Sequence, residues 1–263
     1  MAGRPTSYHE WVSETPPPAA LPAPRGRITA IVPLKALDKA KGRLAGDLDA
    51  SSRRALVAWM FGRVMAACHE AALVTRVLVV AGDRAGAGLA AEHDAQIVVE
   101  PRPGLQRALA TAEAVASRTR RPAATLVVAA DLPLALGADL DRVCAAGGES
   151  GGASSPHPCG PAVVVAPTRD GGTGALYRRP PAVIGTRYGP GSAAAHLRLA
   201  AAAGVNAVLT QVPGLALDVD TAGQLREAAG LDREVAAWLD REVAWTSAMR
   251  DRLTSGACAP PEG

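Results

Sequence analysis

Short runs of β-branched and aliphatic residues alternate with helix-like segments along most of this chain, and this alternation limits the folds it can adopt. Five runs have the composition of buried strands: residues 28–32, 77–80, 97–99, 126–128 and 163–165. Parallel strands that are joined by right-handed helical crossovers form doubly wound sheets. The sequence therefore predicts an α/β fold whose ligands bind at the carboxyl ends of the strands.

The clearest helical pattern begins near residue 51, where apolar residues recur at four-residue spacing from Leu56 to Cys68. Ser51 or Ser52 is a suitable N-cap for this helix. Weaker patterns predict helices at 105–116 and 192–203, and one or two more within 222–252.

The length of the chain, 263 residues with 48% hydrophobic residues, is enough to bury a sizeable core in one large domain. We expect that domain at 27–253. Residues 1–26 are rich in proline and lack periodic apolar positions, which predicts a disordered arm. Residues 254–263 are expected to fray, and the low-complexity stretch 145–161 predicts a loop, either a lid or an insertion.

Charge and apolar patterning argue against several classes of function. The net charge is only +3 and the arginines are dispersed, which argues against a nucleic-acid-binding protein. No apolar run approaches the roughly 18–20 residues that span a bilayer and no signal peptide is visible, so we expect a cytoplasmic protein with no membrane association. The cysteines lack CxxC spacing, which argues against a structural zinc site and a disulfide framework. The histidines form no spaced pair and are predicted at surface or helix positions: His9, His69, His93, His157 and His196.

A basic segment follows the first predicted strand directly. Residues 35–43 contain four cations, Lys35, Lys39, Lys41 and Arg43, at the position where α/β folds hold phosphates. The Walker A pattern GxxxxGK[ST] is absent, which disfavours the P-loop kinases and ATPases. The segment is either a site for a polyanion or a solvated basic surface.

Three aspartates stand where a metal-binding site is expected. Asp131 follows the fourth predicted strand, while Asp218 and Asp220 are two residues apart in an extended stretch, so that both face the same way. Mg²⁺ offsets the repulsion between such carboxylates and typically binds one or two of them together with substrate phosphates. Alternatively, Asp131 forms a turn or N-cap, and Asp220 caps the helix that starts after Thr221.

Two segments are rich in glycine: residues 169–176, and residues 188–192 at the start of a predicted helix. Glycine lets backbone amides approach a ligand, and a helix that starts at Ser192 offers free N–H groups to a carboxylate or phosphate. Each segment is alternatively an ordinary turn. Gly82 and Asp83, after the second predicted strand, either contact guanine or ribose or form a turn.

Taken together and in this order, the segments 35–44, 130–133, 169–176, 188–192 and 218–221 resemble the phosphoenolpyruvate and 2-phospho-L-lactate guanylyltransferases, which begin side-chain assembly of the deazaflavin coenzyme F-420. The resemblance covers residues 28–225. It implies a Rossmann-like, doubly wound mixed sheet, the nucleotide-diphospho-sugar transferase fold in its molybdenum-cofactor guanylyltransferase-like form. It also implies that GTP reacts with a small phosphorylated carboxylate and releases pyrophosphate, and that the labile product passes to a downstream transferase.

The resemblance further implies roles for nine residues. The Mg²⁺ ligands are Asp131, Asp218 and Asp220. The residues that contact the carboxylate end of the acceptor are Thr173, Gly189 and Ser192. The cations at the nucleotide phosphates, where they neutralise the departing pyrophosphate, are Lys35, Lys41 and Arg43.

The chain departs from the family at two positions, Gly174 and Gln106, where the family commonly has asparagine. Phosphoenolpyruvate is the favoured acceptor, and 2-phospho-L-lactate and 3-phospho-D-glycerate are the alternatives. The acceptor phosphate is already an anionic nucleophile, so the mechanism requires no general base. Competing interpretations are a nucleotidyltransferase of the same fold for a molybdenum cofactor or a sugar phosphate, and a non-catalytic nucleotide-binding protein.

Overall fold

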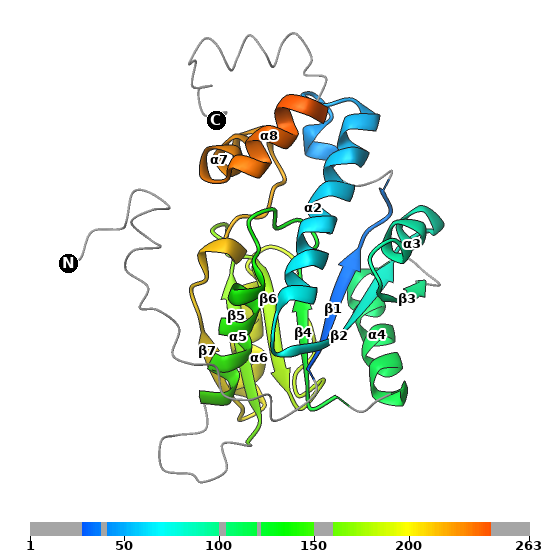
Figure 1. Ribbon diagram of the computed structural model, residues 1–263. Helices are drawn as coiled ribbons and strands as arrows, with labels where there is room; N and C mark the ends of the chain where they lie inside the picture. Colours follow the sequence, from blue (N-terminus) through cyan, green and yellow to red (C-terminus); the bar gives the residue numbers. More distant parts are fainter. Residues whose placement is uncertain (1–27, 38–40, 100–103, 120–121, 150–159, 243–263) are drawn as a thin grey trace, which may run out of the picture.

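The computed structural model describes residues 28–37, 41–99, 104–119, 122–149 and 160–242 (Figure 1). The predicted arm at 1–26 and the predicted tail at 254–263 lie outside these residues. So do most of the predicted loop at 145–161 and the end of the predicted helical segment 222–252.

One mixed sheet organises the described residues, with seven strands in the order β3-β2-β1-β4-β6-β5-β7. The strands are β1 (Ile28–Leu34), β2 (Val74–Ala81), β3 (Gln96–Val99), β4 (Ala124–Val128), β5 (Ala162–Pro167), β6 (Thr173–Arg179) and β7 (Asn206–Leu209). Strand β6 runs antiparallel to both of its neighbours, and the other pairs are parallel. The doubly wound mixed α/β sheet is therefore confirmed, and each of the five predicted strands lies within an observed strand.

Two strands were not predicted. Strand β6 begins inside the segment expected to be a glycine-rich loop. It was not predicted because its sequence, Thr-Gly-Ala-Leu-Tyr-Arg-Arg, has no aliphatic run and ends in two arginines. Strand β7 has four residues and only one β-branched side chain, Val208. Both strands are defined by pairing with β5 and not by their own composition.

The helices of the described residues are α2 (Ala50–Glu70), α3 (Arg84–Ala91), α4 (Leu105–Thr119), α5 (Gly137–Glu149), α6 (Ser192–Ala202), α7 (Ala222–Leu231) and α8 (Arg233–Glu242). Helices α3 and α5 were not predicted, and α5 occupies the start of the segment expected to be a low-complexity loop. The cap of α2 is Asp49, whose carboxylate accepts a hydrogen bond from the Ser52 amide at 2.7 Å, so neither serine is the N-cap. These helices are too short or too polar to span a bilayer.

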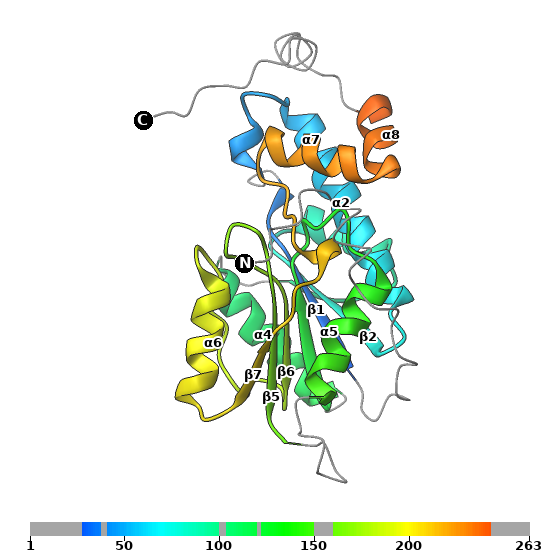
Figure 2. The same cartoon turned by 90° about the vertical axis from the view of Figure 1, so that its left-hand side faces the viewer.

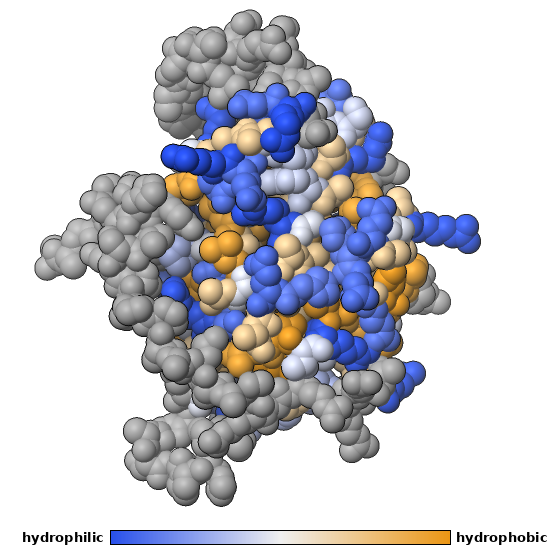
Figure 3. Space-filling view, in the orientation of Figure 1, coloured by the Kyte–Doolittle hydropathy of each residue, from blue (hydrophilic) through white to orange (hydrophobic). Residues whose placement is uncertain are grey.

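Helices cover both faces of the sheet (Figure 2). Residues alternate between the faces, so that Ala30 and Val32 of β1 pack toward α2, α3 and α5 while Ile31 packs toward α4 and α6. On the face in Figure 3, hydrophobic residues lie among hydrophilic ones, and the large apolar residues that are most exposed in the described ranges are Val99, Leu136 and Leu209.

A third apolar cluster lies beyond the carboxyl ends of the strands, where α7 and α8 pack against the first half of α2 (Figure 1). Trp59 stacks on Trp238 with ring centroids 5.1 Å apart. The guanidinium of Arg63 donates to the carbonyl of Pro133 at 3.1 Å and contacts Asp232 at 3.2 Å. The C-terminal helices and the segment after β4 are thus attached to one turn of α2.

A buried ion pair explains how arginine is tolerated within β6. Arg178 is fully buried, and its guanidinium pairs with Glu113 of α4 and donates to the carbonyl of Ile184 at 3.0 Å. A buried charge requires such a partner because desolvation is otherwise uncompensated. The pair joins α4, β6 and the loop that follows β6.

Replacing Glu113 by alanine leaves the Arg178 charge in the interior without its counterion. We expect Glu113→Ala to lower the free energy of unfolding by about 3–5 kcal/mol. Urea denaturation followed by circular dichroism measures this change. Glu92→Ala, an exposed glutamate at the end of α3, is the control and should change stability by less than about 0.5 kcal/mol. Equal effects of the two substitutions would contradict this account.

Candidate active site

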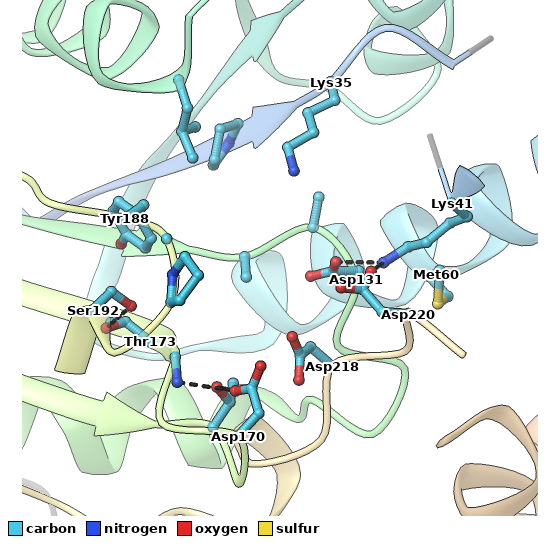
Figure 4. Close-up of a pocket in the computed structure, with 18 of the residues that line it drawn as sticks. Lys35, Lys41, Met60, Asp131, Asp170, Thr173, Tyr188, Ser192, Asp218 and Asp220 are labelled. Carbon is cyan, nitrogen blue, oxygen red and sulfur yellow. Dashed lines mark hydrogen bonds and ion pairs between the residues drawn. The ribbon is translucent and has the colours of Figure 1, made fainter. Parts of the chain in front are cut away.

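All nine residues expected to form the site line one pocket, with a volume of about 520 Å³ (Figure 4). They are Lys35, Lys41, Arg43, Asp131, Thr173, Gly189, Ser192, Asp218 and Asp220. The pocket lies at the carboxyl ends of β1 and β4, as expected for this fold class. Because β6 is antiparallel, its first residue, Thr173, reaches the same edge of the sheet.

The ammonium group of Lys41 lies between two of the aspartates. Its Nζ is 2.6 Å from Asp131 Oδ2 and 2.7 Å from Asp220 Oδ1. Although burial alone would lower the pKa of Lys41, the two carboxylates raise it above its ordinary value. Arg43 adds a weaker contact, 3.7 Å from Asp220 Oδ2. Lys41 has left-handed backbone angles (φ 55°), a conformation that costs a non-glycine residue about 1 kcal/mol.

Asp218 has no ion pair within the described ranges, and its environment is strongly acidic. Burial raises the pKa of its carboxyl to about 6, and the neighbouring carboxylates of Asp131, Asp170 and Asp220 act in the same direction. Asp170 was not predicted as a site residue, although it lies in the glycine-rich segment 169–176. Its Oδ1 accepts from the Gly172 amide at 2.9 Å, in the turn before β6. The pocket therefore contains more carboxylates than Lys41 neutralises.

The side chains fit a magnesium ion. In the described part of the chain, no three His, Cys, Asp or Glu side chains are grouped closely enough to enclose a metal. Mg²⁺ does not require such a cage, because it binds one or two carboxylates and completes its shell with phosphate and water. Asp131 and Asp220 already share one cation, the Lys41 ammonium. Their oxygens are the ligand type that Mg²⁺ prefers.

The capping alternative for Asp220 is excluded by the start of α7. Thr221 is the N-cap, and it forms a capping box in which its own amide donates to Gln224 Oε1 at 2.9 Å. The turn alternative for Gly82 and Asp83 is supported, since Asp83 caps α3 through the Gly86 amide at 2.7 Å and does not line the pocket.

The opposite wall of the pocket carries hydroxyl groups and glycines. Thr173 Oγ1 and Ser192 Oγ, at the starts of β6 and α6, are 2.9 Å apart. Gly189 (φ 135°) and Gly191 (φ 67°) have backbone angles that favour glycine, and Gly191 is the N-cap of α6. This wall presents hydroxyls and a helix N-terminus, which suit an anion.

The two departures from the family pattern have structural explanations. A Cβ atom on Gly174 would lie 2.2 Å from the carbonyl oxygen of Leu215, so asparagine cannot replace this glycine without a backbone shift. Gln106 holds the loop before α6, because its side chain donates to the Tyr188 carbonyl at 3.1 Å and accepts from Thr186 Oγ1 at 2.8 Å.

The prediction that His196 occupies a surface or helix position is confirmed, because it lies in α6. The histidine is nevertheless fully buried, which was not predicted from the sequence. Its Nδ1 is 3.1 Å from Thr173 Oγ1, and its Nε2 accepts from the Arg187 amide at 2.9 Å. A signal was available in the sequence, because His196 lies four residues after Ser192 and thus on the same helix face.

Comparison with known proteins agrees with this site. Residues 28–239 match the family model described as "Guanylyl transferase CofC like". The phosphoenolpyruvate guanylyltransferase of Conexibacter woesei is 34% identical over 197 residues, which are 74% of this chain and 84% of the relative. The enzyme of the same name from Sphaerobacter thermophilus is 35% identical over 202 residues, 76% of this chain and 92% of the relative.

A solved structure shows the same fold. It belongs to a protein from Desulfovibrio desulfuricans G20 that is assigned to the nucleotide-diphospho-sugar transferases, with a TM-score of 0.59 and 14% identity. The match covers 79% of this chain and 97% of the other. The family model spans the whole described sheet, and the two relatives align with about three quarters of this chain. This chain therefore belongs to the CofC-like guanylyl transferase family.

Proposed function

We propose that this protein transfers GMP from GTP to the phosphate group of phosphoenolpyruvate and releases pyrophosphate. The observation that carries this proposal is the pocket itself, which combines a basic segment, a group of carboxylates and a wall of hydroxyls and glycines within about 520 Å³. The names of the relatives favour phosphoenolpyruvate over 2-phospho-L-lactate and 3-phospho-D-glycerate.

Each group of residues has a separate task in this reaction. An oxygen of the acceptor phosphate attacks the α-phosphorus of GTP, a new P–O bond forms, and the bond to the β-phosphate oxygen breaks to release pyrophosphate. The nucleophile is already an anion, so the residues must bring two anions into line and no base is needed. Thr173, Gly189 and Ser192 orient the carboxylate end of the acceptor. Lys35 and Arg43 neutralise the departing pyrophosphate.

The aspartates hold the metal in this proposal. Asp131, Asp218 and Asp220 would bind Mg²⁺, which when bound neutralises phosphate charge and orients the reacting groups. Lys41, which Asp131 and Asp220 share in the metal-free protein, would then be available to the phosphates together with Lys35 and Arg43. We infer that the product, a guanosine-diphospho-linked phosphoacid, is passed to a downstream transferase in coenzyme F-420 assembly.

The first test is pyrophosphate release by the purified protein with GTP and Mg²⁺. Parallel reactions contain phosphoenolpyruvate, 2-phospho-L-lactate, 3-phospho-D-glycerate or no acceptor, and we expect release with phosphoenolpyruvate. Reactions with ATP, or with EDTA in place of Mg²⁺, are the controls and should release little. If no acceptor supports release while GTP and Mg²⁺ bind, the acceptor is another molecule, such as a molybdenum cofactor or a sugar phosphate. If neither binds, the protein is non-catalytic.

The second test is Asp218→Asn. Removing one carboxylate from the proposed metal site should lower turnover at least about 100-fold at saturating Mg²⁺. Initial rates of pyrophosphate release measure the loss. Asp94→Asn, at an exposed position outside the pocket with left-handed backbone angles that asparagine tolerates, is the matched control. Wild-type turnover in Asp218→Asn would show that the metal assignment is wrong.

The same substitution should stabilise the metal-free protein at neutral pH. The folded-state pKa of Asp218, about 6, exceeds its ordinary value of 3.8, so the folded state favours the protonated carboxyl. This contribution is fully present below about pH 4 and is lost as the pH rises through about 6. In EDTA at pH 7.5, Asp218→Asn should therefore melt at a higher temperature than the wild type. The difference should disappear near pH 4; a lower melting temperature at pH 7.5 would contradict the account.

A further inference from the structure

His196 connects the hydroxyl wall of the pocket to the loop before α6. The imidazole is fully buried, and each of its nitrogens has one partner in the described ranges: the Arg187 amide at Nε2 and Thr173 Oγ1 at Nδ1. The ring is also held edge-on by Tyr188, with centroids 5.1 Å apart. Thr173 in turn contacts Ser192 through their hydroxyl oxygens. Figure 4 shows the Thr173 and Ser192 side chains together in the pocket.

The Arg187 amide determines the tautomer of His196. A backbone N–H can only donate, so Nε2 must be the acceptor and carries no proton. A neutral imidazole then has its single proton on Nδ1, and that proton is donated to Thr173 Oγ1. Burial lowers the pKa of His196 to about 4, and the nearby Arg178 acts in the same direction, so the ring is neutral at pH 7.

A count of protons shows what this tautomer does at the pocket surface. Thr173 and Ser192 each have one hydroxyl proton, and the contact between them uses one of the two. Because His196 donates to Thr173, it accepts neither of the two hydroxyl protons. One hydroxyl proton is therefore not used by His196 or within the Thr173–Ser192 pair. In the part of the chain that the structure describes, the two hydroxyls have no other hydrogen-bond acceptor, and both residues line the pocket.

The opposite tautomer would reverse the polarity of this wall. If Nδ1 accepted, the Thr173 proton would go to the ring and the Ser192 proton to Thr173 Oγ1. The two hydroxyl groups would then present only oxygen lone pairs to the pocket, and lone pairs repel a carboxylate. The direction of the hydrogen bond at Nδ1 therefore decides whether this wall donates to an anion or repels it.

We propose that His196 is a positioning residue that fixes the proton order of the Thr173–Ser192 pair, so that one hydroxyl donates to an anionic oxygen of the acceptor. This inference rests on the proposed function for the identity of the acceptor. His196 acts through Thr173 and does not itself touch the substrate, since it does not line the pocket.

Two amide substitutions separate the two hydrogen bonds of the ring. In His196→Asn, the side-chain NH₂ can stand at the position of Nδ1 and donate to Thr173, while the contact with the Arg187 amide is lost. In His196→Gln, the longer side chain can accept from the Arg187 amide at the position of Nε2, while donation to Thr173 is lost. Both variants carry an uncharged amide, and their difference in length decides which of the two bonds each one keeps.

We expect His196→Gln to raise the KM for phosphoenolpyruvate about tenfold, because a hydrogen bond to a charged group is lost. His196→Asn should stay within about threefold of the wild type, and the KM for GTP should change in neither variant. If His196→Asn is impaired as much as or more than His196→Gln, the ring acts by holding the loop at Arg187, and the proposal is overturned.

A spectroscopic test does not depend on activity. In wild-type protein labelled with ¹⁵N-histidine, a long-range ¹H–¹⁵N spectrum at pH 7 distinguishes the two tautomers and the imidazolium. We expect a protonated Nδ1 and a bare Nε2 for His196, assigned by the absence of its signals in His196→Asn. A protonated Nε2 overturns the proposal. Failure of the proposed function is separate, since it would appear as absent pyrophosphate release in a protein with the expected tautomer.

Discussion

Mutual repulsion among carboxylates is the constraint on which the arrangement of this site depends. Asp131, Asp218 and Asp220 meet at one end of the sheet, and Asp170 adds a fourth negative charge nearby. A lysine held in a left-handed backbone conformation places its ammonium between two of them. The neighbouring Asp218 stays unpaired in the described ranges, which favours its protonated form. Such a site is stabilised by an added cation or by the loss of a charge, so the carboxylates proposed to hold the metal lower the stability of the metal-free protein.

The other wall of the pocket depends on polar contacts made by three separate elements. Arg178 of β6 binds the Ile184 carbonyl, Gln106 of α4 binds the Tyr188 carbonyl, and His196 of α6 accepts from the Arg187 amide. These contacts hold the backbone of the loop between β6 and α6 in place. The glycines of this loop have no side chains that could anchor it, so their backbone angles depend on these contacts.

The parts of the fold that sequence reasoning predicted are those that carry a local signal. The five predicted strands have continuous aliphatic runs, and α2 has strong four-residue periodicity. Strands β6 and β7 lack that signal. Strand β6 carries Arg178, whose burial requires Glu113 from a distant helix, and β7 has only four residues. The nine site residues were predicted because cations, aspartates and glycines follow strands or open helices. His196 and Asp170 were missed, since their importance comes from contacts that exist only after the chain has folded.

The ion pairs of Lys41 have a consequence for the order in which the protein acquires its site during synthesis. Lys41 pairs with Asp131 across 90 residues of chain and with Asp220 across 179. Contacts between such distant positions form late, because the loop that they close is long. A nascent chain from which residues 218–220 have not yet emerged contains most of the sheet but lacks two of the three aspartates. The proposed nucleotide and metal would therefore meet a complete site only when the domain is nearly finished, and their binding would stabilise the whole domain and not a folding fragment of it.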